Sequence, residues 1–165
     1  AARPRLVAVL AQVRDPGNAG AVIRTADAAG ADAVVLTDGS VDPHNPKTVR
    51  ATAGSLFHLP VVSDADLAGA TAALRGAGLT VLAADGHGDL DLDDLLDVAG
   101  RPAPGVPDLA APTAWLFGNE AWGLPEADRA TADAVVRVPL RGRAESLNLA
   151  TAAAVCLYAS SRAQR

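Results

Sequence analysis

The sequence predicts an α/β fold in which a mainly parallel sheet carries helices on both faces. Short continuous apolar runs, such as residues 6–11 (LVAVLA), are typical of strands that are buried on both faces. Stretches with helical spacing follow several of these runs, so strands and helices alternate along the chain. The chain has 165 residues, of which 50% are hydrophobic, and this is enough for a buried core. We therefore expect residues 1–165 to form a single domain.

The first half of the chain contains three predicted pairs of strand and helix. The turn at residues 15–18 ends in a residue type that commonly caps helices, and Gly30 marks where the first helix stops. Residues 42–46 form a loop, and Asp64 is placed to cap the third helix. In chain order, the expected elements are strand 6–11, helix 19–29, strand 33–36, helix 47–55, strand 61–62 and a helix that ends near residue 75.

The second half continues the alternation after a proline-rich segment. Residues 100–112 carry four prolines and predict an exposed connection, not a domain boundary. The expected elements are strand 80–84, turn 85–88, strand 114–117, helix 125–131, strand 134–138 and a terminal helix over 148–161.

The composition excludes several classes of protein. The net charge of −5 argues against a protein that coats nucleic acid non-specifically. Two Trp, two Phe and one Tyr are few for the stacking platforms of single-strand binders. One Cys and three scattered His cannot assemble a zinc cluster, so we expect no metal. Cys156 lies in an apolar stretch, which predicts a buried neutral thiol.

Targeting signals are also missing from the sequence. It has no apolar run of transmembrane length and no signal-peptide pattern, so we expect a cytoplasmic protein without membrane contact. The lack of Met predicts that the chain is a processed or excised segment of a longer protein. Arg supplies 13 of the 14 basic residues. This suits bidentate phosphate contacts but also follows from a GC-rich gene, so charge alone leaves an RNA partner open.

Three polar clusters interrupt the apolar pattern, at residues 18–25, 117–124 and 146–150. Each follows an apolar run that predicts a strand, and the first and third lead into helices. Because the carboxyl ends of parallel strands meet at one edge of a sheet, these clusters can converge on one pocket. The three His lie outside the clusters, so no Ser–His–Asp triad is proposed. The Gly-x-Gly-x-x-Gly and P-loop patterns are absent, which disfavours a conventional NAD or ATP site.

Each cluster allows a structural as well as a functional interpretation. Arg24 can be a solvated helix residue, although the helix N-terminus before it favours anions. Glu120 can cap the next helix, or it can be paired, because an unpaired carboxylate after a core strand is costly. Ser146 or Asn148 can be an ordinary N-cap of the terminal helix.

Taken in order, the clusters resemble the three motifs of the SpoU (TrmH) family of RNA ribose 2′-O-methyltransferases, within the SPOUT superfamily. Residues 42–60 also resemble the family's region after its first motif. The matching positions are Asn18, Gly20, Arg24 and Thr25 in the first motif, Gly118, Asn119, Glu120 and Gly123 in the second, and Ser146 and Asn148 in the third.

The resemblance implies a fold, a cofactor and an assembly. The fold would end in a deep trefoil knot, an exception to the usual rule against knots. The chain would be the catalytic domain of a longer protein and would form a homodimer through its first and terminal helices. S-adenosyl-L-methionine would be the cofactor. Its expected contacts are Ala83, Ala84, Asp85, Gly118, Asn119, Glu120, Val138, Leu140 and Leu147.

The resemblance also implies catalytic roles. Arg24 would grip the phosphate beside the target ribose, because a guanidinium is a poor base. Glu120 and Asn148 would hold Arg24 or the ribose, Ser146 would complete that network, and Asn18 would fix the loop of the first motif. Expected contacts to RNA phosphates are Lys47, Arg50, Arg141 and Arg143.

The predicted function is S-adenosylmethionine-dependent 2′-O-methylation of a ribose in RNA, with 23S-type ribosomal RNA favoured as the substrate. A transfer RNA substrate is one alternative. A catalytically silent knotted RNA-binding module is another, although such a module has no need of Arg24, Glu120, Ser146 and Asn148 together. A Rossmann-type nucleotide-binding enzyme is the third, and it lacks its phosphate fingerprint.

Overall fold

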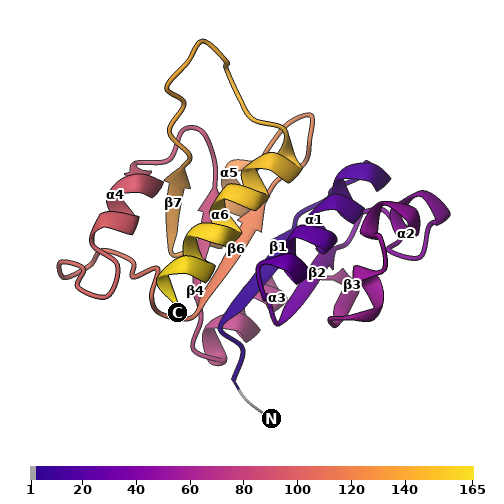
Figure 1. The fold of residues 1–165 in the computed structure, drawn as a ribbon, viewed down its shortest axis with the longest axis horizontal. Coiled ribbons are helices and arrows are strands. Elements are labelled where there is room, and N and C mark those ends of the chain that lie inside the picture. The colour runs from indigo at the N-terminus through magenta and orange to yellow at the C-terminus, as the bar shows by residue number, and fades with distance from the viewer. Residues whose placement is uncertain (1–2) are drawn as a thin grey trace.

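The computed structural model describes residues 3–165, and these form one seven-stranded parallel sheet with helices on both faces (Figure 1). The predicted fold class is confirmed. The strand order is β3-β2-β1-β6-β4-β7-β5. The strands are β1 (Leu6–Leu10), β2 (Ala33–Thr37), β3 (Val61–Ala65), β4 (Thr80–Ala84), β5 (Leu90–Asp91), β6 (Thr113–Phe117) and β7 (Ala134–Arg137). The helices are α1 (Pro16–Ala28), α2 (Pro46–Thr52), the 3-10 helix η1 (Ser55–Phe57), α3 (Leu67–Gly76), α4 (Leu92–Asp97), α5 (Glu126–Arg129) and α6 (Leu149–Ala163).

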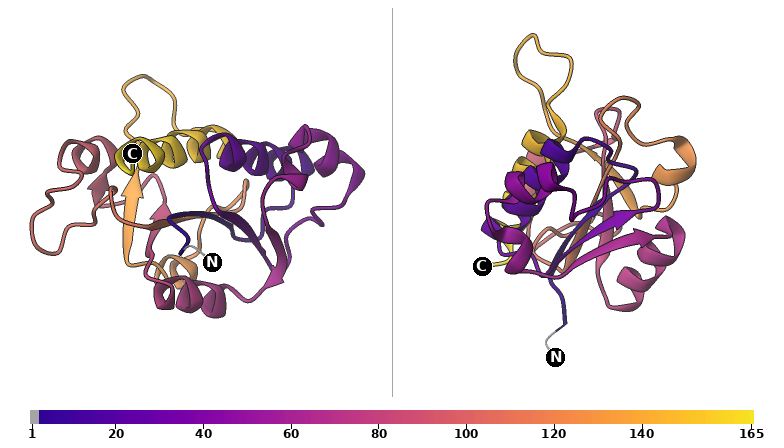
Figure 2. Two further views of the ribbon diagram at one scale, coloured as in Figure 1. Left: turned by 60° about the horizontal axis from the view of Figure 1, so that its bottom comes forward. Right: turned by 90° about the vertical axis from the view of Figure 1, so that its right-hand side faces the viewer.

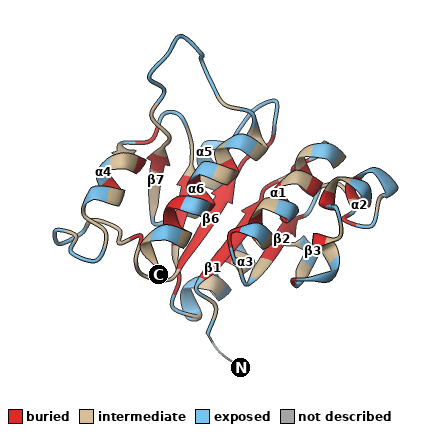
Figure 3. Cartoon of the chain, in the orientation of Figure 1, coloured by how far each residue is buried: buried red, intermediate tan, exposed pale blue. Residues whose placement is uncertain are grey.

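The sheet separates two hydrophobic cores, because successive side chains of a strand point to opposite faces. In β1, Leu6, Ala8 and Leu10 pack with α1 and α6, whereas Val7 and Val9 face α3. Figure 2 shows α1 and α6 along one face of the sheet and α3 on the other. Every residue of the neighbouring strands β1 and β6 is buried, and Figure 3 shows both strands in red at the centre.

The observed helices differ in their bounds from the predicted ones, and two of these differences have a clear cause. The expected helix 47–55 is two elements, because Ala53 and Gly54 adopt left-handed conformations, with φ of 48° and 96°, between α2 and η1. The third helix is capped by Asp66, whose carboxylate accepts from the Gly69 backbone N–H at 2.7 Å, and not by Asp64. Asp64 instead lies in β3 with a φ of 55°.

The acidic segment after β4 contains elements that the sequence analysis did not assign. Leu90–Asp91 pairs with β7 as β5, and Leu92–Asp97 forms α4, which buries Leu92 and Leu95. Asp93, Asp94 and Asp97 therefore lie away from the buried leucines of a short amphipathic helix. Residues 100–112 form a connection, as expected, but Leu109 in it is fully buried in the larger core.

Strand β7 lies between β4 and β5, which follow each other closely in the chain. The connection from residue 85 to 89 therefore crosses the carboxyl end of β7. At this crossing a Cβ on Gly88 would lie 2.7 Å from the Val136 carbonyl carbon and from the Arg137 nitrogen, so the position admits only glycine. The trefoil knot stays a prediction, and this crossing supports it.

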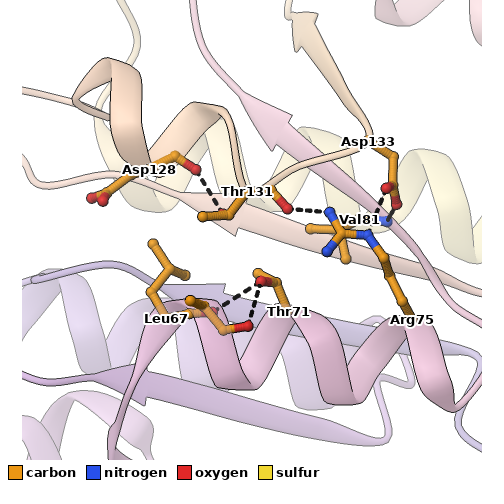
Figure 4. Close-up of polar contacts among 8 residues, drawn as sticks. Leu67, Thr71, Arg75, Val81, Asp128, Thr131 and Asp133 are labelled. Atoms are coloured by element: carbon orange, nitrogen blue, oxygen red, sulfur yellow. Dashed lines mark hydrogen bonds and ion pairs between the residues drawn. The ribbon is translucent and has the colours of Figure 1, made fainter.

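A polar clamp joins the end of α3 to the segment before β7 (Figure 4). Arg75 Nε donates to Asp133 Oδ1 at 2.6 Å, and an Arg75 terminal nitrogen donates to the Thr131 carbonyl oxygen. The other carboxylate oxygen of Asp133 accepts from the Val81 backbone N–H at 2.7 Å. The ion pair is partly exposed and therefore adds little stability. Its main effect is to hold the segment before β7 beside α3 and β4.

Helix α6 is fixed to the central strand by a buried hydrogen bond. The indole nitrogen of Trp115 in β6 donates to the Ser160 hydroxyl at 2.9 Å, and both residues are fully buried. Nearby Cys156 is also buried, as predicted, and burial raises the pKa of its thiol.

Each helix among residues 3–165 is too short or too polar to cross a bilayer.

We expect Ser160→Ala to destabilise the domain by about 1–3 kcal/mol, because it leaves the buried Trp115 N–H without an acceptor. Chemical denaturation measures the change. Ser161→Ala is the control, since this neighbour makes no side-chain hydrogen bond among the described residues, and we expect a change within about 0.5 kcal/mol. Equal losses in the two variants would contradict the assignment.

Candidate functional site

A cavity of about 470 Å³ opens at the carboxyl ends of β4, β6 and β7. This is the edge at which parallel α/β sheets place ligands. Three chain segments supply most of its wall: residues 84–87, 117–124 and 138–152. The lining residues are Ala84, Asp85, Gly86, His87, Phe117, Gly118, Asn119, Glu120, Ala121, Trp122, Gly123, Leu124, Val138, Leu140, Glu145, Ser146, Leu147, Leu149 and Ala152.

The second polar cluster forms a tight turn after β6. Asn119 and Gly123 exchange two backbone hydrogen bonds, of 3.0 and 2.9 Å, and Gly123 has a φ of 69°. A Cβ on Gly118 would lie 2.3 Å from the Gly123 carbonyl carbon. These two glycines are therefore needed for the backbone path itself. The side chain of Asn119 is nearly buried and donates to the Gln12 carbonyl oxygen at 2.6 Å.

Glu120 connects this turn to the loop before α1. Its two carboxylate oxygens accept from the backbone N–H groups of Asp15, at 2.8 Å, and Arg14, at 3.3 Å. Asp15 in turn caps α1 by accepting from the Asn18 N–H at 2.7 Å. The carboxylate thus satisfies backbone donors that lie outside the helix, and it does not cap α5.

The third polar cluster meets the first. Asn148 Nδ2 donates to Asn18 Oδ1 at 3.1 Å, across 130 residues of sequence. The oxygen of the same Asn148 amide caps α6 by accepting from the Ala150 and Thr151 N–H groups at 2.9 and 3.4 Å. Asn148 of the third cluster bonds Asn18 of the first directly, whereas Glu120 of the second reaches the first only through Asp15. The second and third clusters line the cavity, but no residue of the first cluster does. The predicted convergence on one pocket therefore holds for two clusters, and the first lies beside them.

Most of the expected cofactor contacts lie at the cavity. Eight of the nine residues line it, and the exception is Ala83. Ala83 is fully buried in the core on the α3 side, because β4 alternates its side chains and presents Ala84 at the cavity instead.

The network expected around Arg24 is not formed. Arg24 is exposed on α1, and within residues 3–165 its side chain makes no hydrogen bond or ion pair. Glu120 and Asn148 bond the Asp15 loop and Asn18 instead. Asn18 holds Asn148 rather than its own loop, which Asp15, Glu120 and Asn119 fix. Ser146 lines the cavity and has no hydrogen-bond partner in the described part of the chain.

The expected RNA contacts are exposed but differ in their surroundings. Lys47 and Arg50 lie on α2, and Arg143 lies in the long loop before α6 that protrudes in Figure 1. Arg141, in the same loop, pairs with Asp93 of α4 at 2.6 Å, and this carboxylate raises the pKa of the Arg141 guanidinium. A phosphate would therefore compete with Asp93 for Arg141.

Sequence reasoning missed several residues at the cavity. Trp122 lies on its rim with the Arg14 guanidinium 5.1 Å from the ring centroid. Asp85 pairs with Arg129 at 3.4 Å and with His87 at 3.2 Å, and the exposed His87 also lines the cavity. Trp122 lies within the second polar cluster, and its place among residues predicted to line a site was the sequence signal that could have identified it. Across residues 3–165, no group of three or more His, Cys, Asp or Glu side chains is arranged to hold a metal ion.

We expect Glu120→Ala to release the loop before α1, because two backbone donors lose their acceptor. Amide hydrogen exchange at Arg14 and Asp15 should speed up by tenfold or more, while the strands keep their protection. Glu126→Ala, an exposed carboxylate in the first turn of α5, is the matched control and should leave this loop unchanged. Unchanged exchange in Glu120→Ala would contradict the role assigned to this carboxylate.

Comparison with known proteins identifies the family. The model of the SpoU rRNA Methylase family matches residues 5–158. The chain is 41% identical, over 95% of its length, to the 23S rRNA (guanosine(2553)-2′-O)-methyltransferase RlmP of Bacillus subtilis, and 39% identical, over 89%, to the 23S rRNA (uridine(2479)-2′-O)-methyltransferase of Streptomyces viridochromogenes. The matched region spans 58% of the length of the Bacillus subtilis enzyme and 49% of the length of the Streptomyces viridochromogenes enzyme. The structure of the SpoU methyltransferase AviRb from Streptomyces viridochromogenes with the cofactor AdoMet has a TM-score of 0.81 and 35% identity, covering 98% of this chain and 61% of that one. The chain belongs to the SpoU rRNA methylase family.

Proposed function

We propose that this chain is a catalytic domain that transfers a methyl group from S-adenosyl-L-methionine to a ribose 2′-hydroxyl of ribosomal RNA, most closely of the 23S type. The observation that carries the proposal is the cavity at the sheet edge, which the second and third polar clusters line and to which the Asn148–Asn18 hydrogen bond ties the first. The names of the relatives, two 23S rRNA 2′-O-methyltransferases, support the reaction and the substrate. The cytoplasm, where ribosomal RNA is found, is the proposed location.

The cavity fits a cofactor of this size and chemistry. Its volume of about 470 Å³ lies in the range of small-molecule sites, roughly 300–1,000 Å³. Val138, Leu140 and Leu147 offer apolar contacts for an adenine ring. Among residues 139–147 no backbone group bonds to another backbone group, so these amides and carbonyls are free to bond a ligand. When bound, S-adenosylmethionine supplies a methyl group that its sulfonium charge already activates.

The proposed cofactor contacts are those expected residues that line the cavity. Asp85 is held in place by Arg129 and His87, and Asn119 and Glu120 are held by the tight turn and the loop before α1. The set is Ala84, Asp85, Gly118, Asn119, Glu120, Val138, Leu140 and Leu147.

The remaining chemistry is to orient the ribose hydroxyl and to remove its proton. Arg24 is exposed and unpaired within the described residues, so its guanidinium is available to grip the phosphate beside the target ribose. It does not act as the base, because a guanidinium is not deprotonated in proteins. The proton passes to that phosphate or to a neighbouring group. Ser146 lines the cavity, makes no side-chain hydrogen bond within residues 3–165, and is the proposed contact to the ribose.

The domain is further proposed to act as a homodimer. Helix α6 buries Cys156 and Leu157 against the sheet, yet Val155 and Tyr158 are 40% and 50% exposed on its outer side. The Tyr158 hydroxyl donates to the Ala28 carbonyl oxygen of α1 at 3.3 Å, so the two helices share this surface. These exposed apolar side chains of α6, beside α1, suit an isologous interface between two copies.

The first experiment is calorimetric titration of the domain with S-adenosylmethionine and S-adenosylhomocysteine, after sedimentation equilibrium has tested the dimer. We expect saturable binding near one molecule per chain. Leu140→Ala should weaken binding by about tenfold, because it removes apolar contacts to the ligand. Val62→Ala, which shortens another exposed aliphatic side chain, on β3 and outside this cavity, is the control. A folded protein that binds neither ligand would contradict the proposal and favour the silent module.

A methyl-transfer assay then tests which RNA is the substrate and whether Arg24 binds the phosphate beside the target ribose. With ribosomal RNA and bulk transfer RNA as competing acceptors, we expect the label from S-adenosylmethionine in ribosomal RNA. Arg24→Lys should lower turnover at least tenfold and leave cofactor binding unchanged, because an ammonium cannot make the bidentate contact. Arg101→Lys, in the connection between α4 and β6, is the control. Near-full turnover of Arg24→Lys would rule out bidentate gripping, and label in transfer RNA alone would move the substrate to that class.

A further inference from the structure

An exposed tryptophan lies on the rim of the cavity. Trp122 is 49% exposed, whereas the other tryptophan, Trp115, is fully buried in the core. Exposing an indole ring costs apolar burial that a core position would have gained. Trp122 lies at the tip of the turn after β6 and lines the cavity together with Glu120 and Ser146. Its position thus offers an aromatic surface beside the proposed site of methyl transfer.

The turn that carries Trp122 is rigid. The Asn119–Gly123 hydrogen bonds close it, the Ala121 N–H donates to Asn119 Oδ1 at 2.8 Å, and Glu120 ties it to the loop before α1. A ring on such a turn loses little conformational entropy when a ligand stacks on it. The backbone that carries the ring is therefore held in place before any partner binds.

Arg14 extends this aromatic surface with a positive charge. Its guanidinium carbon lies 5.1 Å from the Trp122 ring centroid, within the range of a cation–π contact. Its backbone N–H is held by Glu120 at 3.3 Å, but within residues 3–165 its side chain makes no hydrogen bond or ion pair. A guanidinium that lies over a ring still directs its N–H groups outward in its own plane, where a phosphate can accept them.

We infer that Trp122 and Arg14 together bind one unpaired nucleotide of the RNA substrate, with its base stacked on the indole and its phosphate bonded to the guanidinium. This inference rests on the proposed function and names the form of RNA that the site takes. Bases in a duplex already stack on their neighbours, so only a nucleotide in a loop, a bulge or a single strand can present its face to Trp122. The substrate is thus a single-stranded or looped segment.

The test is a titration with a short oligouridylate, in which tryptophan fluorescence reports binding. Because Trp115 is fully buried, quenching on addition of RNA reports Trp122. We expect Trp122→Ala to weaken RNA binding by about tenfold or more, the usual effect of losing one stacking contact, with affinity for S-adenosylmethionine unchanged. Trp122→Phe should recover most of the RNA affinity. Arg14→Gln should reduce the slope of log affinity against log salt by roughly 0.7.

Two controls separate the possible failures. Phe57→Ala removes an aromatic side chain that is 81% exposed but does not line the cavity, and RNA binding should not change. A fully paired RNA duplex should bind wild type and Trp122→Ala equally. The inference is overturned if Trp122→Ala binds oligouridylate as wild type does, if wild type binds none, or if cofactor affinity falls in parallel, because Trp122 would then be part of the cofactor wall. A folded wild-type protein that binds no S-adenosylmethionine would instead refute the proposed function.

Discussion

The carboxylate of Glu120 provides the interaction on which the site depends. It follows the central strand β6 and accepts from two backbone N–H groups of the loop between β1 and α1. Asn119, one residue earlier, adds a third bond to that loop through the Gln12 carbonyl oxygen. Since β1 and β6 are neighbours in the sheet, these contacts close the edge of the sheet where both strands end. The start of α1 is positioned by this connection, because Asp15 also caps that helix.

Backbone conformation at the site is adapted to these bonds. Gln12 has a φ of 52°, which is uncommon for a residue other than glycine, and it receives bonds on both sides: its N–H donates to Thr37 Oγ1 at 3.0 Å and its carbonyl oxygen accepts from Asn119. Such strained positions persist where the surrounding structure holds them, often beside functional sites. Gly20 shows a related constraint, because a Cβ there would lie 2.5 Å from the Ala51 Cβ. This glycine of the first motif thus serves the packing of α1 on α2.

The long loop between β7 and α6 differs from the rest of the site in its freedom. Residues 139–147 carry cavity-lining side chains but no backbone bonds of their own, and the Arg141–Asp93 ion pair is largely exposed. By contrast, the loop ends at Asn148, which both caps α6 and bonds Asn18. The cavity therefore has a firm wall at the turn after β6 and a more adaptable wall at this loop. A rigid wall suits orientation, and an adaptable one suits closure around a ligand.

The sequence by itself determined the alternation of strands and helices, the parallel sheet, the burial of Cys156 and the meeting of the second and third polar clusters at one cavity. These follow from local patterns: apolar runs of strand length, capping residues, and the rule that parallel strands end at one edge. Short elements were less accessible, because β5 has two residues and α4 hides two leucines among carboxylates. Partner choice was decided only by tertiary structure. Glu120 and Asn148 bond Asp15 and Asn18 rather than Arg24, and Trp122 contacts Arg14. Hydrogen bonds and ring contacts between distant segments depend on side-chain geometry within a few tenths of an ångström. The spacing of residues in the sequence does not encode that geometry.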